Sequence, residues 1–293
     1  MEKIAIITDS CSDVSKEYRE KYDIYVLPMV VQHNEKEYKD GIDITAEDVY
    51  RLQENDILKT ASPAGSDVLD TFEEIKKKGY THAIVVSLAS GLSGTFNSIR
   101  LMAMDEEDLT IEVYDTKSGS IGYGAIAVLL AKYRDEGLSF EELKQKALFL
   151  IENCFVYFSI DTLEHLQRGG RIGKATAFVG TLMKIKPILS FEKETGEIYV
   201  PAKVRGKKAV LPQLVSLVEK HITDHPDKKF FILTADGGSP KEREELETRL
   251  KEKFPQMEGF LTGKIGAALS TYLGSGLLGA GVVMITSPSF SKI

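Results

Sequence analysis

The chain has 293 residues, of which 43% are hydrophobic, and its 37 basic and 44 acidic side chains give a net charge of -7. This length favours two domains, and the acidic balance argues against nucleic acid or an anionic membrane as the main partner. Two cysteines, Cys11 and Cys154, are too few for a disulfide framework or a thiolate metal site. The start of the sequence does not resemble a signal peptide, and no apolar run approaches about 18 residues. We therefore expect a cytoplasmic protein without integral membrane contact.

The first elements in chain order are a strand and a polar turn. Lys3 to Ile7 form a short apolar strand that ends in the turn Thr8 to Asp13. Helices on both sides of such a strand indicate a parallel sheet, at whose carboxyl edge α/β proteins bind ligands. The same turn suits a simple helix cap equally well. Further on, Tyr25 to Val31 is typical of a strand, His33 to Glu37 of a hairpin turn, and Thr45 to Asp48 of a capping box.

A helix with a marked start follows. Ser62 stands at the expected cap position, Pro63 at the first helical position and Gly79 at the far end. Thr60 is left just outside this helix. We therefore expect its hydroxyl to be free to face a site.

The segment from Ser87 to Ser98 combines a strand end, a polar turn and a helix start. It follows the apolar run Ala83 to Val86, and Gly94 leaves backbone room for a ligand. Ser93 and Thr95 place hydroxyls beside the unpaired N–H groups of the first helical turn, which favours an anion. The alternative is that one of these hydroxyls only caps its own helix.

A third strand-to-loop junction marks the end of the first half. The strand Ile111 to Tyr114 leads into Asp115 to Gly124, whose glycines suit either ligand contact or close packing of the helix that follows. After a second helix, Leu138 to Asn153, a strand pattern restarts. We therefore expect an N-terminal α/β domain with a parallel sheet at 1–154 and a C-terminal α/β domain at 155–293, with the ligand site between them.

The second half again alternates strands and helices. Its loop Leu166 to Gly173 holds Arg168 and Arg171 beside three glycines, which suits a carboxylate or phosphate but also an ordinary exposed basic turn. A hairpin pairs Lys186 to Phe191 with Glu197 to Val200. Strands at 230–234 and 282–285 and helices at 208–221 and 240–254 complete the α/β pattern.

Catalytic and cofactor motifs are incomplete. Gly91 to Thr95 approaches the nucleophile elbow of hydrolases but has Thr95 where the second glycine belongs. Gly274 to Gly279 matches the dinucleotide fingerprint, yet it precedes a strand instead of a helix. The chain has no phosphate loop for ATP, and His221 with His225 lacks a third metal ligand. We therefore predict no catalytic residue, no metal and no cofactor.

Short motifs along nearly the whole chain together match the pattern of one known protein family. They are Thr8-Asp9-Ser10, Thr60-Ala61-Ser62-Pro63, Leu92-Ser93-Gly94-Thr95, Asp115-Thr116, Gly169-Gly170-Arg171-Ile172, Lys186-Pro187-Ile188-Leu189, and Ile265-Gly266-Ala267-Ala268 leading into Gly274-Ser275-Gly276. Together they resemble the DegV family, bacterial proteins that bind a fatty acid between two α/β domains.

The resemblance implies a site and a role. The implied ligand-binding residues are Thr60, Ser62, Ser93, Gly94, Arg171, Thr271 and Tyr272, with Thr60 and Ser93 on the carboxylate. The implied role is to carry a long-chain fatty acid, without catalysis of its own, to a separate fatty acid kinase that makes acyl phosphate for phospholipid synthesis.

Two positions depart from the family pattern. Tyr272 stands where the family usually has His, and Ala61 stands where it usually has Ser. A tyrosine donates one neutral hydrogen bond and brings no titratable cation near neutral pH. Tyr272 can therefore offer the ligand's carboxylate a neutral hydrogen bond but no positive charge.

The acyl chain would supply most of the affinity. Burying about a dozen methylenes at roughly 0.8 kcal/mol each contributes on the order of 10 kcal/mol, against roughly 1.5 to 3 kcal/mol for each hydrogen bond to the charged head group. Residues such as Phe178, Leu182, Ile188, Leu269 and Leu273 would line its pocket. An apolar stripe of this kind is more often ordinary core.

Two functions from different classes follow. The first is fatty-acid binding, and the alternative is a small-molecule hydrolase or acyltransferase that uses Ser93 as its nucleophile. The first predicts a stoichiometric free fatty acid in an organic extract of the native protein. The alternative predicts a covalent acyl-Ser93 adduct or no ligand.

Overall fold

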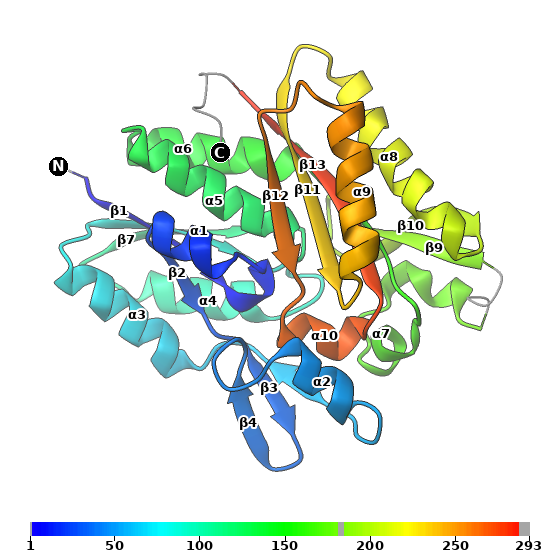
Figure 1. The fold of residues 1–293 in the computed structure, drawn as a ribbon. Coiled ribbons are helices and arrows are strands. Elements are labelled where there is room, and N and C mark those ends of the chain that lie inside the picture. Colours follow the sequence, from blue (N-terminus) through cyan, green and yellow to red (C-terminus); the bar gives the residue numbers. More distant parts are fainter. Residues whose placement is uncertain (1, 181–184, 287–293) are drawn as a thin grey trace.

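The computed structural model describes residues 2–180 and 185–286 and shows a mixed α/β fold (Figure 1). The first half is built on a parallel sheet in the order β2-β1-β6-β7. Along β1, Ile4 and Ile6 join one core cluster while Ala5 and Ile7 join another on the opposite face, as alternation in a strand requires. The elements are β1 (Ile4–Asp9), β2 (Ile24–Leu27), β6 (His82–Ser87), β7 (Thr110–Asp115), α1 (Lys16–Lys21), α3 (Gly65–Lys77), α4 (Thr95–Met104) and α6 (Phe140–Glu152).

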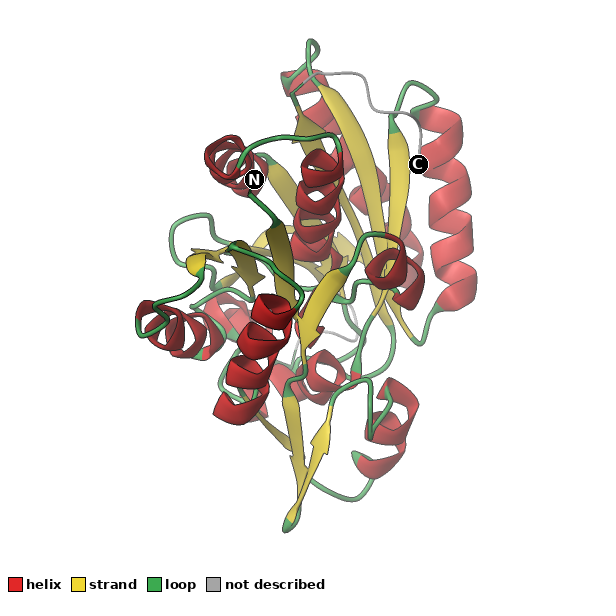
Figure 2. Ribbon diagram, turned by 90° about the vertical axis from the view of Figure 1, so that its left-hand side faces the viewer, coloured by secondary structure: helices red, strands yellow, loops and turns green. Residues whose placement is uncertain are grey.

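The second half is built on a six-stranded sheet in the order β10-β9-β8-β13-β11-β12. Only β11 and β12 pair in parallel among these described strands. Figure 2 shows helices on both sides of the large sheet. The elements are β8 (Cys154–Ser159), β9 (Ile185–Phe191), β10 (Ile198–Arg205), β11 (Lys229–Gly237), β12 (Gly259–Lys264), β13 (Leu277–Ile285), α7 (Glu164–Arg168), α8 (Val210–Asp224) and α9 (Pro240–Lys253).

Helix α5 (Ile121–Asp135) lies between the two large sheets. All its residues from Ile121 to Tyr133 are buried. Its core cluster includes Ile84 from the first sheet and Phe231 from the second, so the two halves share one apolar core. The predicted domain boundary after residue 154 falls at the start of β8. It remains a prediction, because α5 packs on both large sheets and so does not belong to one half alone.

A small antiparallel sheet closes the lower end of the molecule in Figure 1. It has the order β4-β3-β5, from Lys36–Lys39, Val30–His33 and Lys59–Ala61. Helix α2 (Ala46–Leu52) accompanies it and carries the predicted capping box of Thr45 and Asp48, which the structure confirms. Helix α10 (Ala267–Leu273) packs beside α2, so a segment near the end of the chain rests on its first half.

Two predicted boundaries are wrong. Tyr25 to Val31 is not one strand, because Pro28 has no N–H group and the chain changes sheets there, from β2 to β3. Ser62 does not cap a helix, since α3 begins at Gly65 and Ala64 occupies its cap position. Strand β12 and helix α10 had no predicted counterpart.

Candidate ligand-binding site

A largely apolar cavity of about 220 Å³ lies where loops of the first half meet the second sheet. Phe158, Gly279 and Ala235 are aligned across β8, β13 and β11, and all three line this cavity. Strand alternation puts such aligned residues on one face of the sheet. Further apolar walls come from Leu88, Leu92, Leu166, Phe191, Leu269 and Leu273.

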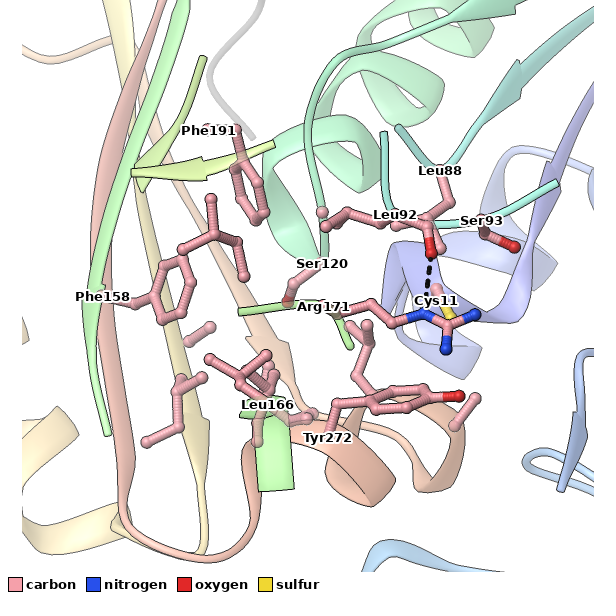
Figure 3. A pocket seen from close by; sticks show the side chains of 18 of the residues that line it. Cys11, Leu88, Leu92, Ser93, Ser120, Phe158, Leu166, Arg171, Phe191 and Tyr272 are labelled. Carbon is pink, nitrogen blue, oxygen red and sulfur yellow. Dashed lines mark hydrogen bonds between the residues drawn. The ribbon is translucent and has the colours of Figure 1, made fainter. Parts of the chain in front are cut away.

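Polar side chains gather at one end of the cavity. Figure 3 shows Ser93, the Arg171 guanidinium and the Tyr272 hydroxyl on the side away from Phe158. The Tyr272 hydroxyl is hydrogen-bonded to the Thr60 hydroxyl at 2.8 Å. The cavity therefore has an apolar body and one end equipped with hydroxyl and guanidinium groups.

Ser93 belongs to a local hydroxyl network at the start of α4. Its oxygen lies 2.8 Å from the Thr95 hydroxyl and accepts the Thr95 N–H. The Thr95 hydroxyl in turn contacts Ser62 at 3.1 Å. Gly94 occupies the cap position of α4 and also lines the cavity. Ser62, predicted as a helix cap, thus takes part in the cavity wall instead.

Ser93 has no partner for nucleophilic catalysis in the described part of the cavity. No histidine, aspartate or glutamate lines it there. A serine nucleophile needs a base within hydrogen-bond reach of its hydroxyl. The geometry suits Ser93 as a hydrogen-bonding group.

Arg171 connects the α7 loop to the serine turn. Its Nε donates to the Leu92 carbonyl at 3.2 Å, and its guanidinium lies 5.1 Å from the centre of the Tyr272 ring (Figure 3). A second guanidinium nitrogen donates to the Gly169 carbonyl. Gly169 is needed at this point because a Cβ would overlap the Tyr272 ring. Arg171 and Tyr272 therefore hold each other in place.

Two buried carboxylates fix the start of α10. Asp13 accepts the Gly266 N–H and Asp40 accepts the Ala267 N–H, each at 2.8 Å. Burial raises the pKa of both carboxyls. The polar turn after β1, predicted to suit either a ligand or a helix cap, thus supplies Asp13 to the start of α10 and Cys11 to the cavity lining. Its Asp9 accepts hydrogen bonds from Ser87, Leu88 and Tyr123.

Thr271 differs from the other predicted site residues in its position. Six of the seven line this cavity, whereas Thr271 is buried in α10 and lines a neighbouring cavity that Thr60, Arg171 and Tyr272 also border. Its hydroxyl donates to the Ala267 carbonyl, and its own carbonyl accepts from Gln53. Thr271 therefore stabilises α10 and its contact with α2.

A second cavity of about 230 Å³ adjoins the polar end of the first. The two share Thr60, Arg171 and Tyr272 as walls. Burial and the nearby Arg168 lower the pKa of His165, which lines the second cavity. His165 is therefore neutral at pH 7.

The predicted acyl-lining residues divide between the cavity and other places. Leu269 and Leu273 line it. Ile188 is fully buried in the other core cluster, under α8, so its assignment is wrong. Phe178 packs against the core outside the cavity lining, and Leu182 lies outside the described residues.

Several lining residues were missed by sequence reasoning. Met29, Gly119 and Ser120 all line the cavity. Ser120 could have been predicted, because it lies in the loop Asp115 to Gly124, whose composition suits ligand contact. Met29 could not, because it follows the break between β2 and β3, which the sequence pattern did not reveal.

The described residues contain neither a membrane-spanning helix nor a metal-binding cluster. None of their helices is both long enough and apolar enough to cross a bilayer. They also hold no group of three or more His, Cys, Asp or Glu side chains that could bind a metal ion.

Comparison with known proteins gives consistent matches along the chain. A family model described as uncharacterised protein, DegV family, matches residues 3–284. A DegV domain-containing protein of Clostridium acetobutylicum is 36% identical over 279 residues, which cover 95% of this chain and 98% of the relative. Protein DegV of Bacillus subtilis is 29% identical over 280 residues, covering 94% and 97%.

Solved structures match over nearly the full chain as well. A DegV family protein from Thermus thermophilus, described by its fatty acid binding, has a TM-score of 0.89 at 26% identity and covers 97% of this chain and 100% of its own. A stearic acid-binding protein from Eubacterium ventriosum has a TM-score of 0.85 at 25% identity, covering 96% and 98%.

Proposed function

This chain belongs to the DegV family, and we propose that it binds a long-chain fatty acid in the apolar cavity between its two halves. The observation that carries this proposal is a cavity that is apolar along its body and polar at one end. Fatty acids have the same division. The fatty-acid binding of structurally similar relatives supports the assignment.

The cavity has room for part of an acyl chain. At the roughly 30 Å³ that a water-sized group takes up in a liquid, its volume of about 220 Å³ holds on the order of seven such groups. Each buried methylene contributes roughly 0.8 kcal/mol, so the tail sets affinity.

The polar end fits a carboxylate. Ser93, Thr60 and Tyr272 offer hydroxyl donors, and Arg171 supplies a positive charge. Hydrogen bonds to an ionised acceptor are about twice as strong as neutral ones, so these groups orient the head. They leave the carboxylate beside the second cavity.

The carboxylate would be presented to a separate kinase. The chain has no phosphate loop of its own, and no general base lines the described part of the cavity. The protein would therefore hold and orient the acid while a partner supplies the phosphoryl group. This role as a binding subunit of a cytoplasmic kinase system is part of the proposal.

Native mass spectrometry before and after organic extraction tests the proposed function. We expect one non-covalent fatty acid for each chain, released intact by the solvent. A mass increase that survives denaturation and maps to Ser93 would favour the hydrolase or acyltransferase. The Ser93→Ala variant should keep the non-covalent ligand and would lose a covalent one.

Ser93→Ala is expected to weaken fatty-acid binding about tenfold, because one hydrogen bond to the charged head group is lost. Calorimetric titration with palmitate measures the change. Ser98→Ala is the matched control, because Ser98 lies on α4 outside the cavity lining. Equal affinities for Ser93→Ala and wild type would remove Ser93 from the head-group site.

Tyr272→Phe is expected to reduce affinity by about threefold and to leave it independent of pH between about 5.5 and 8. A tyrosine brings no titratable cation near neutral pH. Burial lowers the pKa of His165, which lines the second cavity, and so disfavours its charged form. Titrations at several pH values in wild type and variant measure both effects. A steep loss of affinity with rising pH would instead assign a charged histidine to the site.

A further inference from the structure

A third cavity, of about 600 Å³, lies on the face of the second sheet that α8 and α9 cover. Ser159 and Leu278 are aligned across β8 and β13, and both line it. Their chain neighbours Phe158 and Gly279 line the apolar cavity, as alternation along a strand requires. A ligand in the third cavity would therefore be separated from a fatty acid by the sheet.

The third cavity lies at the carboxyl ends of two strands. β8 ends at Ser159 and β11 ends at Gly237, and the two run in the same direction because β13 lies antiparallel between them. Helix α9 begins at Pro240, directly after β11. A crevice at the carboxyl ends of strands is the usual place for a ligand in α/β sheets.

Two buried serine side chains line the third cavity without a partner. Ser159 is 5% exposed and Ser239 is 6% exposed. Neither hydroxyl makes a hydrogen bond within the part of the chain that the structure describes. Burying a hydroxyl without a hydrogen bond is costly, so such groups normally contact water or a ligand. The two serines therefore indicate that this cavity receives a polar group.

The start of α9 adds backbone donors to the two serines. Ser239 occupies the cap position of this 14-residue helix, but its side chain does not cap it. Pro240 follows at the first helical position and has no N–H group. The N–H groups of the next two residues are therefore left for a ligand, and the helix dipole favours a negative charge there.

Cations outnumber acids in the lining of the third cavity. The charged residues are Lys186, Lys207, Lys208, Arg249, Asp161, Glu242 and Glu245. Asp161 lies 3.5 Å from Lys186 and 3.4 Å from Lys207, and Glu245 pairs with Arg249. Lys208 has no ion pair among the described residues. Its charge is therefore available to a ligand.

We propose that the third cavity is a second ligand site, which binds a small organic anion, either a phosphate ester or a carboxylate. The anionic oxygens accept hydrogen bonds from Ser159, Ser239 and the first turn of α9, and Lys208 balances their charge. The organic part packs against Leu211 and Leu278, which supply apolar wall. This inference does not depend on fatty-acid binding, because the described linings of the third and apolar cavities share no residue.

Titration with phenyl phosphate, benzoate and phenol tests the inference, with the Gly276 and Leu278 amides followed by NMR. We expect the better of the two anions to bind at least tenfold more tightly than neutral phenol. Ser159→Ala and Ser239→Ala should each weaken that anion threefold to tenfold, roughly, and Lys208→Gln about threefold at low salt. The matched control is Ser216→Ala, because Ser216 is exposed on α8 outside the cavity lining.

Three further readings decide the outcome. The serine variants should keep the thermal unfolding midpoint of wild type, because their hydroxyls have no partner in the described protein; a lower midpoint together with weaker binding would overturn the inference. Equal affinities for the anion in wild type and both serine variants, or equal binding of phenol and the anions, would overturn it as well. Displacement of phenyl phosphate by palmitate would place the probe in the apolar cavity. Failure of palmitate to bind would contradict the proposed function alone.

Discussion

Replacing Gly279 with leucine is expected to weaken stearate binding by on the order of a hundredfold while decanoate binding persists. Gly279 is flanked in register by Phe158 and Ala235, and all three face the cavity. A leucine side chain there takes the space of about four methylenes, each contributing roughly 0.8 kcal/mol when buried. The effect should therefore depend on chain length.

Gly279→Ala is the matched control for this prediction. A Cβ at Gly279 meets its nearest neighbours, the Tyr157 carbonyl and the Phe158 Cβ, at 3.5 and 3.6 Å, which is ordinary contact. We expect the alanine variant to bind stearate within about threefold of wild type. Calorimetric titration with both acids, and thermal unfolding of both variants, measure the result. Equal losses for stearate and decanoate would place the acyl chain elsewhere.

The fold class was predictable from sequence because strands, polar turns and helices alternate with clear local signals. The comparisons confirm the resemblance to the DegV family, and the structure confirms the α/β class. Helix α10 was missed because seven residues are too few to show helical periodicity. Its stability comes instead from Asp13 and Asp40, more than 200 residues away in the chain.

The candidate site was predictable only in part because a sequence pattern does not say which face of a buried element a residue occupies. In β9, Ile188 and Leu189 are both fully buried, yet they belong to different core clusters on opposite faces. Both are apolar residues in one continuous run, so the sequence does not show which of them faces the cavity. The hydroxyl of Ser93 stood out because it follows a strand end at a turn, and that of Thr60 because it lies just before an expected helix start. The domain limits, the roles of the site residues and the kinase partner remain predictions.

Gly169→Ala is expected to weaken binding of all fatty acids tenfold or more, without regard to chain length, because it acts at the head-group end. The added methyl would overlap the Tyr272 ring, so the ring has to move. The move breaks the hydrogen bond from Tyr272 to Thr60 and the stacking of Arg171 on the ring. Titration with stearate and decanoate should show similar losses for the two acids.

A double-mutant cycle with Tyr272→Ala separates this overlap from a general disturbance of the α7 loop. Truncating the ring removes the overlapping atoms, so Gly169→Ala should have little further effect on affinity in the Tyr272→Ala background. The backbone of Gly169 itself accepts alanine, because its φ of -78° is ordinary for any residue. If the two substitutions instead act additively, Gly169 affects binding through the loop, and the close approach to Tyr272 does not control the head-group site.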